Sequence, residues 1–117
     1  MTAACYVTAM RARLLVLALA VTLTGACKRP SAESCEEALR NYAQLTYWEK
    51  AEQEIAAAPL AEREALRAAK LVERDAKIKE GMDFAVGQCR AARDFDGVKC
   101  MKAARTAAAA RACRKPW

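Results

Sequence analysis

Residues 34–59 read SCEEALRNYAQLTYWEKAEQEIAAAP, and this stretch decides the fold. Ser34, followed three residues later by Glu37, forms a capping-box pattern that predicts the start of a helix. Pro59 suits the first turn of a second helix and is a poor continuation of the first. We therefore expect a helix from about Cys35 to Ala58. Its predicted apolar face consists of Cys35, Ala38, Leu39, Tyr42 and Leu45, with Trp48 at the edge.

A second, long helix is expected from about Pro59 to Arg93, and its last third is expected to bend at Gly81 and Gly87. Its predicted apolar stripe consists of Leu71, Ile78, Met82, Ala85 and Cys89. Asp96 is the expected N-cap of a third helix from about Gly97 to Arg114, which is rich in Ala and basic residues. No stretch has a strand pattern. The sequence thus predicts an all-α fold, a small antiparallel bundle of about three helices.

The N-terminal residues have the pattern of a secretory signal. From Met10 the chain has two arginines, then the uncharged stretch 14–26, then Cys27. A helix needs about 20 apolar residues to span a ~30 Å hydrocarbon core, so this stretch is short for a permanent transmembrane helix. An N-terminal anchor that is retained is the alternative interpretation. Because Met10 opens a complete signal by itself, we expect translation to begin there, and residues 1–9 to be absent from the mature protein.

Residues 23–27, LTGAC, resemble the lipobox of bacterial lipoproteins. The resemblance implies that Cys27 receives a diacylglycerol and becomes the first residue after cleavage; Thr24 stands where that family usually has Leu. A plain secretory cleavage site, which would leave Cys27 as a free thiol, is the alternative. Lys28, rather than Asp, implies by the same resemblance an outer-membrane protein facing the periplasm. The expected organisation is a signal peptide (1–26), a lipidated cysteine with its tether (27–33), and a helical domain (34–117).

Composition excludes several kinds of site. The chain has no histidine, which removes Ser-His and Cys-His dyads, H-E-x-x-H zinc sites and C-x-x-C-H haem attachment. The cysteines have no C-x-x-C spacing, so zinc and thioredoxin-like sites have no support either. We expect no cofactor and no metal. The apolar content is largely alanine, so the core is thin and depends on disulfides.

Four cysteines remain in the expected domain, and an exported domain of this size should pair them in two disulfides. If residues 97–114 form one helix, Cys100 and Cys113 lie about 20 Å apart. A disulfide requires Cα atoms about 4.4–6.8 Å apart, which excludes this pair and with it Cys35–Cys89. Folding the chain at turns near residues 58 and 95 brings Cys89 level with Cys100, and Cys35 near Cys113. The predicted disulfides are therefore Cys35–Cys113 and Cys89–Cys100.

Charge is segregated along the chain. Residues 33–64 carry eight acidic and three basic side chains, and residues 84–117 carry two acidic and eight basic ones. One interpretation is that the first and third helices pack together with complementary charge. The other is that the third helix binds an anionic partner, with Lys99, Lys102, Arg105 and Trp117 as candidate contacts. Nucleic acid is not an expected partner of a lipid-anchored periplasmic protein.

The stretch from Cys89 to Cys113 has the pattern C-x10-C-x12-C after a lipobox and a helical segment. In this it resembles small, Ala-rich, cysteine-stapled bacterial lipoproteins of unknown function. A fainter resemblance is to conjugal entry-exclusion lipoproteins, through Trp48, the pair Glu62-Arg63 and the Cys100-x-x-Ala103 spacing. Neither resemblance supplies a catalytic residue.

These observations favour a non-enzymatic lipoprotein of the cell envelope, a structural or binding module held at the membrane by its lipid. Its expected partner is an envelope protein or an anionic envelope component. The alternatives are a periplasmic inhibitor or exclusion factor and a glycan hydrolase that uses paired carboxylates. The candidate carboxylates are Glu36, Glu37, Asp94 and Asp96, all at predicted helix starts, where capping accounts for acidic residues. Tyr42, Tyr47 and Trp48 are expected mainly in the core, with a binding anchor as the second interpretation.

Overall fold

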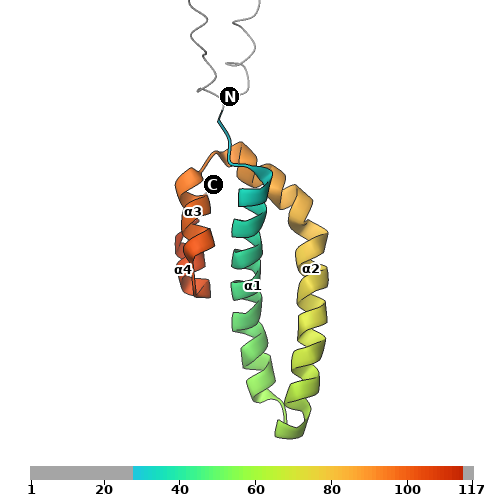
Figure 1. Cartoon of the computed structure of the whole chain (residues 1–117). Helices are drawn as coiled ribbons and strands as arrows, with labels where there is room; N and C mark the ends of the chain where they lie inside the picture. Colours follow the sequence, from blue (N-terminus) through green and yellow to red (C-terminus); the bar gives the residue numbers. More distant parts are fainter. Residues whose placement is uncertain (1–27, 115–117) are drawn as a thin grey trace, which may run out of the picture.

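The computed structural model describes residues 28–114, and within them the fold is all-α. The helices are α1 (Ala32–Ala57), the short 3₁₀ helix η2 (Leu60–Glu62), α2 (Arg63–Ala92), α3 (Phe95–Ala103) and α4 (Ala107–Ala112). α1 and α2 form an antiparallel hairpin, and α3 and α4 cover the N-terminal half of α1 on the side away from α2 (Figure 1). The chain is thus a small helical bundle, as predicted.

α1 begins one turn earlier than predicted. Ser31, not Ser34, is the N-cap: its Oγ accepts a hydrogen bond from the backbone N–H of Ser34 at 3.0 Å. The other end is as predicted. The helix stops at Ala57, and Ala58 is extended with ψ 155° because the residue before a proline avoids the helical region.

α2 is a continuous helix of 30 residues that includes both glycines. Its last third bends toward the N-terminal end of α1 (Figure 1), as the glycines predicted. It ends where Arg93 adopts the left-handed conformation, φ 54°, a position usually taken by glycine.

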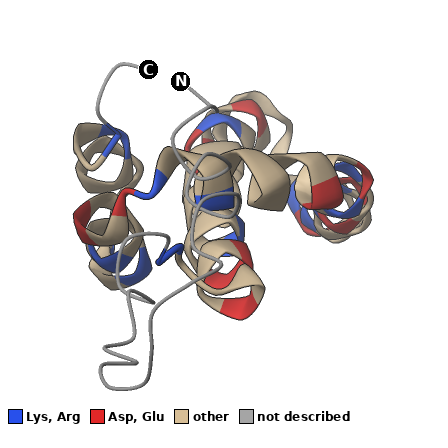
Figure 2. Ribbon diagram, turned by 90° about the horizontal axis from the view of Figure 1, so that it is seen from above, with Lys and Arg blue, Asp and Glu red and all other residues tan. Residues whose placement is uncertain are grey.

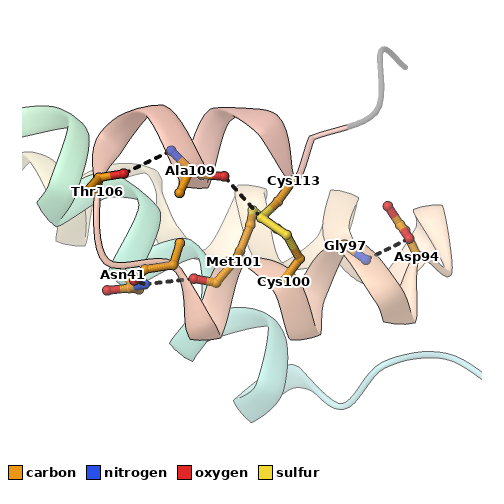
Figure 3. The surroundings of a disulfide bond; sticks show 9 residues. Asn41, Asp94, Gly97, Cys100, Met101, Thr106, Ala109 and Cys113 are labelled. Carbon is orange, nitrogen blue, oxygen red and sulfur yellow. Dashed lines mark hydrogen bonds between the residues drawn. A yellow bond between two sulfur atoms is a disulfide. The ribbon is translucent and has the colours of Figure 1, made fainter.

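The single third helix predicted for residues 97–114 is wrong: the segment forms two helices. Asp94, not Asp96, caps α3, and α3 ends at Ala103. The hydroxyl of Thr106 then caps α4 by accepting from the backbone N–H of Ala109 at 3.1 Å (Figure 3). α4 therefore turns back and lies beside α3.

This turn also overturns the predicted disulfides. Cys35 is bonded to Cys89, and Cys100 to Cys113. The exclusion of Cys100–Cys113 assumed one straight helix, but the return of α4 brings the two Cα atoms to 5.6 Å (Figure 3). Cys35–Cys89, with Cα atoms 6.0 Å apart, joins the start of α1 to the end of α2.

The core lies where the helices meet at the end of the hairpin nearest the N-terminus. Its buried members are Cys35, Ala38, Cys89, Val98, Met101 and Cys113, with Leu39, Tyr42 and Val86 packed against them. Leu71, predicted in this stripe, is 40% exposed. In that part of α2 the residues that contact α1 include Lys70 and Arg74. Lys70 is the neighbour of Leu71, so the face toward α1 is displaced by one residue from the predicted stripe.

Candidate functional site: an apolar groove beside a basic edge

An open apolar groove of about 830 Å³ runs between α1, the second half of α2, and the α3–α4 pair. Its apolar wall includes Leu39, Tyr42, Ile78, Met82, Phe84, Ala85, Val98 and Met101. Lys77 and Arg114 are its basic lining residues, and Asp94 is its acidic one.

Two residues of α2, Gly81 and Phe84, characterise its side of the groove. A Cβ added at Gly81 would meet no atom within 4 Å, so there is open space at this point of the helix. Phe84 lines the groove with 76% of its surface exposed, although a benzyl side chain normally gains about 1.5–3 kcal/mol from burial. An apolar groove with an exposed aromatic side chain is typical of a binding surface.

Arg114 lies against an aromatic ring at the groove. Its guanidinium carbon is 5.2 Å from the centre of the Tyr42 ring, and its Nη1 donates to the Tyr42 hydroxyl at 3.2 Å. Among residues 28–114 no carboxylate forms an ion pair with Arg114. By contrast, the Lys77 ammonium lies 2.5 Å from Glu73, and Asp94 is occupied as the cap of α3. Of the three charged lining residues, Arg114 is therefore the one that can pair with an anionic ligand.

Below the groove, a polar network joins the two helices of the hairpin. Glu73 on α2 accepts from Lys77 at 2.5 Å and from the Tyr47 hydroxyl of α1 at 3.1 Å. These hydrogen bonds lower the pKa of Glu73 to about 2. Partial burial and the adjacent carboxylate raise the pKa of Tyr47. Figure 2 looks down the hairpin and shows both basic and acidic residues on α2. Arg67 and Lys70 of α2 pair with Glu52 and Glu54 of α1, so polar contacts also hold this part of the hairpin.

The predicted basic contacts are separate from the groove. Lys99 and Lys102 line a shallow hollow of about 610 Å³, beside Ser31 and Glu37. Lys102 is paired with Glu37 of α1 at 2.6 Å, and Arg111 of α4 is paired with Glu49. These ion pairs fit the interpretation that the acidic and basic helices pack together.

The remaining predicted contacts lie elsewhere. Arg105 is exposed in the turn between α3 and α4. Trp117 lies outside the described residues, as does Cys27, so the predicted lipidation is a proposal below.

The candidate hydrolase carboxylates have structural contacts. Glu36 pairs with Arg40 at 2.7 Å, Glu37 with Lys102, and Asp94 caps α3. Asp96 lies in the first turn of α3, where an acidic side chain interacts favourably with the helix dipole. Three of the four thus have structural partners, and the fourth lies in the first turn of a helix.

The aromatic residues of α1 are divided between two environments. Tyr42 packs against the core and lines the groove. Tyr47 and Trp48 are half-buried lower on the hairpin, where Arg67 and Arg74 lie 5.9 and 5.8 Å from the Trp48 ring centre. Only Tyr42 therefore belongs to the candidate site.

Sequence reasoning did not identify the groove residues Gly81, Phe84 and Arg114 as a site. A signal was present for Phe84, which falls outside the predicted core stripe of α2 and is a large apolar residue on another face. In the described part of the chain, no three His, Cys, Asp or Glu side chains gather closely enough to hold a metal ion. No helix within residues 28–114 has the length and apolarity needed to cross a membrane.

Comparison with known proteins returns no relative from which a role could be transferred: no protein family, curated protein or solved structure matches this chain.

Proposed function

We propose that this protein is a lipid-anchored lipoprotein of the cell envelope, of the small, Ala-rich, cysteine-stapled kind. In this proposal Cys27 carries the lipid, the helical domain faces the periplasm from the outer membrane, and the protein acts by binding rather than by catalysis. The anchor rests on the lipobox-like LTGAC, whose cysteine stands four positions before Ser31, the cap of α1.

The observation that carries the binding role is the groove. A domain this small stabilises itself by burying its large apolar side chains, yet here Phe84 is exposed beside an open apolar surface. Two disulfides hold the helices that form its walls, so the surface is preorganised and a ligand loses less free energy in ordering it.

The test has two parts. Cells are labelled with a palmitate analogue, and the wild-type protein should be labelled while Cys27→Ser is not. Equal labelling of both forms contradicts the anchor. For the binding role, Phe84→Ser should abolish capture of whatever ligand the membrane-bound protein takes up, while both disulfides still form. Retained capture would place the binding surface elsewhere.

The basic hollow is the second candidate surface, and one observation favours it. Lys99 has no ion-pair partner within residues 28–114 and lies beside the segment that leads to Cys27. It could therefore contact an anionic envelope component. Replacing Lys99 and Arg105 with Gln should then reduce capture of an anionic partner and its dependence on salt, without unfolding the domain.

A further inference from the structure

We propose that the groove binds a single unesterified long-chain fatty acid, with its carboxylate at Arg114 and Tyr42 and its hydrocarbon chain along α2. This inference deepens the proposed binding role and rests on it.

The groove combines a long apolar wall with one cation, Arg114, that has no ion-pair partner in residues 28–114, and this chemistry fits an apolar chain with an anionic head. The groove's lining residues on α2 run from Lys77 to Ala92, about 22 Å at the helical rise of ~1.5 Å per residue. A helix, from another protein or from a second copy of this chain, is the competing occupant, and the crosslinking below distinguishes it from a fatty acid.

An extended peptide does not match the chemistry of the groove walls. Its backbone N–H and C=O groups need hydrogen-bond partners, and each one buried without a partner costs about 1–3 kcal/mol. The walls of the groove are helices whose backbone groups bond within their own turns, and most of the lining side chains are apolar. A hydrocarbon chain has no polar groups to satisfy.

The length agrees with one acyl chain. Half of a ~30 Å bilayer core, about 15 Å, is the reach of a membrane acyl chain, which leaves room for a head group within a groove of about 22 Å. Met82 and Met101 line the groove, and their unbranched side chains adapt to flexible apolar ligands.

The polar contact favours a carboxylate. Arg114 is the groove cation without a carboxylate partner in the described residues, and stacking on Tyr42 holds its guanidinium in place. The Tyr42 oxygen accepts from Arg114, so its own O–H proton remains free to donate. The guanidinium and the phenol thus offer two donors side by side. Charge-assisted hydrogen bonds of this kind are among the strongest in proteins.

The glycines of α2 supply a matched pair of variants. Gly81 lines the groove and Gly87 does not, and a Cβ added at either meets nothing within 4 Å. Both positions therefore have room for the Cβ of a larger residue. We expect the side chain of Gly81→Trp to occupy the groove and that of Gly87→Trp to leave it open.

The experiment uses the full chain in isolated membranes. A fatty acid with a mid-chain diazirine and a terminal alkyne is added, irradiated and mapped, alongside an analogue with an alcohol head group. We expect crosslinking to the tryptic peptide of residues 80–90, which carries Met82 and Phe84, and competition by unlabelled oleate. Gly81→Trp should lower the crosslinking at least tenfold, and Gly87→Trp should not. Arg114→Gln should lower it roughly tenfold for the acid and little for the alcohol.

Equal crosslinking of wild type and Gly81→Trp, or equal effects of Arg114→Gln on both probes, would overturn the inference. To separate this failure from that of the proposed function, p-benzoylphenylalanine replaces Phe84. If it crosslinks to an envelope protein while the fatty acid probe labels nothing, the groove binds a protein and the fatty-acid inference is wrong. Crosslinking to neither would contradict the binding role as well.

Discussion

The Oδ1 atom of Asp94 accepts the backbone N–H of Gly97 at 2.9 Å, and a Cβ on Gly97 would lie 2.7 Å from the Asp94 Cγ. The cap of α3 therefore requires glycine at this position. Replacing Gly97 with alanine would stabilise the helix by up to about 1 kcal/mol through propensity. It would also displace the Asp94 carboxylate, and the loss of that capping hydrogen bond costs about as much.

This relationship predicts a coupled pair of mutations. Asp94→Ala should destabilise the protein by about 1 kcal/mol through loss of the cap. Gly97→Ala should be close to neutral in the wild type but should stabilise the Asp94→Ala variant by up to about 1 kcal/mol. Urea unfolding of the four forms measures the coupling. Additive effects would show that the two side chains do not compete for the same space.

Asn41 should be the most sensitive polar residue between α1 and α3. Its Nδ2 donates to the carbonyl oxygens of Met101 at 2.7 Å and Ala104 at 3.0 Å, which are free at the end of α3. Asn41→Ala leaves both without this partner, and we expect a loss of about 1–3 kcal/mol in the free energy of unfolding. Arg40→Ala, which removes only an exposed ion pair with Glu36, is the control and should change stability by less than about 0.5 kcal/mol.

The disulfides should be visible in a non-reducing tryptic map. Cys35–Cys89 joins the peptides of residues 29–40 and 80–90, and Cys100–Cys113 joins those of residues 100–102 and 112–114. A linked pair of residues 29–40 and 112–114 would instead support the pairing predicted from the sequence.

The two disulfides should also differ in their effect on stability. In the chain-entropy model, the 54-residue separation of Cys35–Cys89 is worth about 4 kcal/mol, and the 13-residue separation of Cys100–Cys113 about 3 kcal/mol. Replacing each pair with alanine and measuring thermal unfolding tests this order. If removing Cys100–Cys113 lowers the stability more than removing Cys35–Cys89, this disulfide stabilises the fold by more than the entropy of closing a short loop.

Acid should weaken the α1–α2 hairpin. The pKa of Glu73 is lowered to about 2, first by its hydrogen bond with Lys77 and then by that with Tyr47. A group whose pKa is depressed on folding contributes its full stabilisation above its ordinary pKa, here 4.5, and loses it as pH falls toward the folded value. The loss should therefore fall between about pH 4.5 and 2. Carboxyl NMR of Glu73 measures the midpoint, and Tyr47→Phe should raise it; an unchanged midpoint would mean that Tyr47 has no effect on the carboxylate.

Arg93 should tolerate glycine better than arginine. Its φ of 54° lies in the left-handed region, which costs a residue with a side chain about 1 kcal/mol. Arg93→Gly should raise the free energy of unfolding by up to about 1 kcal/mol. Ala91→Gly, within the last turn of α2, is the control and should lower it by a similar amount.

The sequence was sufficient for the hairpin because its signals are local. The helical spacing of apolar residues and the break at Pro59 determine α1 and α2 with little help from the rest of the chain. The end of α3 is different: alanines surround Thr106, and a continuous helix would satisfy their propensity equally well. Tertiary contacts hold the turn there, through the Asn41 bonds and the Cys100–Cys113 disulfide. One missed turn therefore made both predicted disulfides wrong.

The groove could not be predicted for a related reason. It is formed by three separate segments, and its shape depends on where α4 returns beside α3. Arg114 belongs to the site only because the missed turn brings it to Tyr42. In the sequence it is one of many basic residues in an Ala-rich stretch.

The position of Cys35–Cys89 has a mechanical consequence. α1 starts at Ala32, so a pull applied to the chain at its N-terminal side enters the fold three residues before Cys35. There the covalent bond to Cys89 transmits the force directly to the C-terminal end of α2. α1 cannot separate from α2 starting at this end, because a covalent bond joins the two helices there. If Cys27 anchors the protein in a membrane, a force on the N-terminal segment moves the domain without separating α1 from α2 at this end.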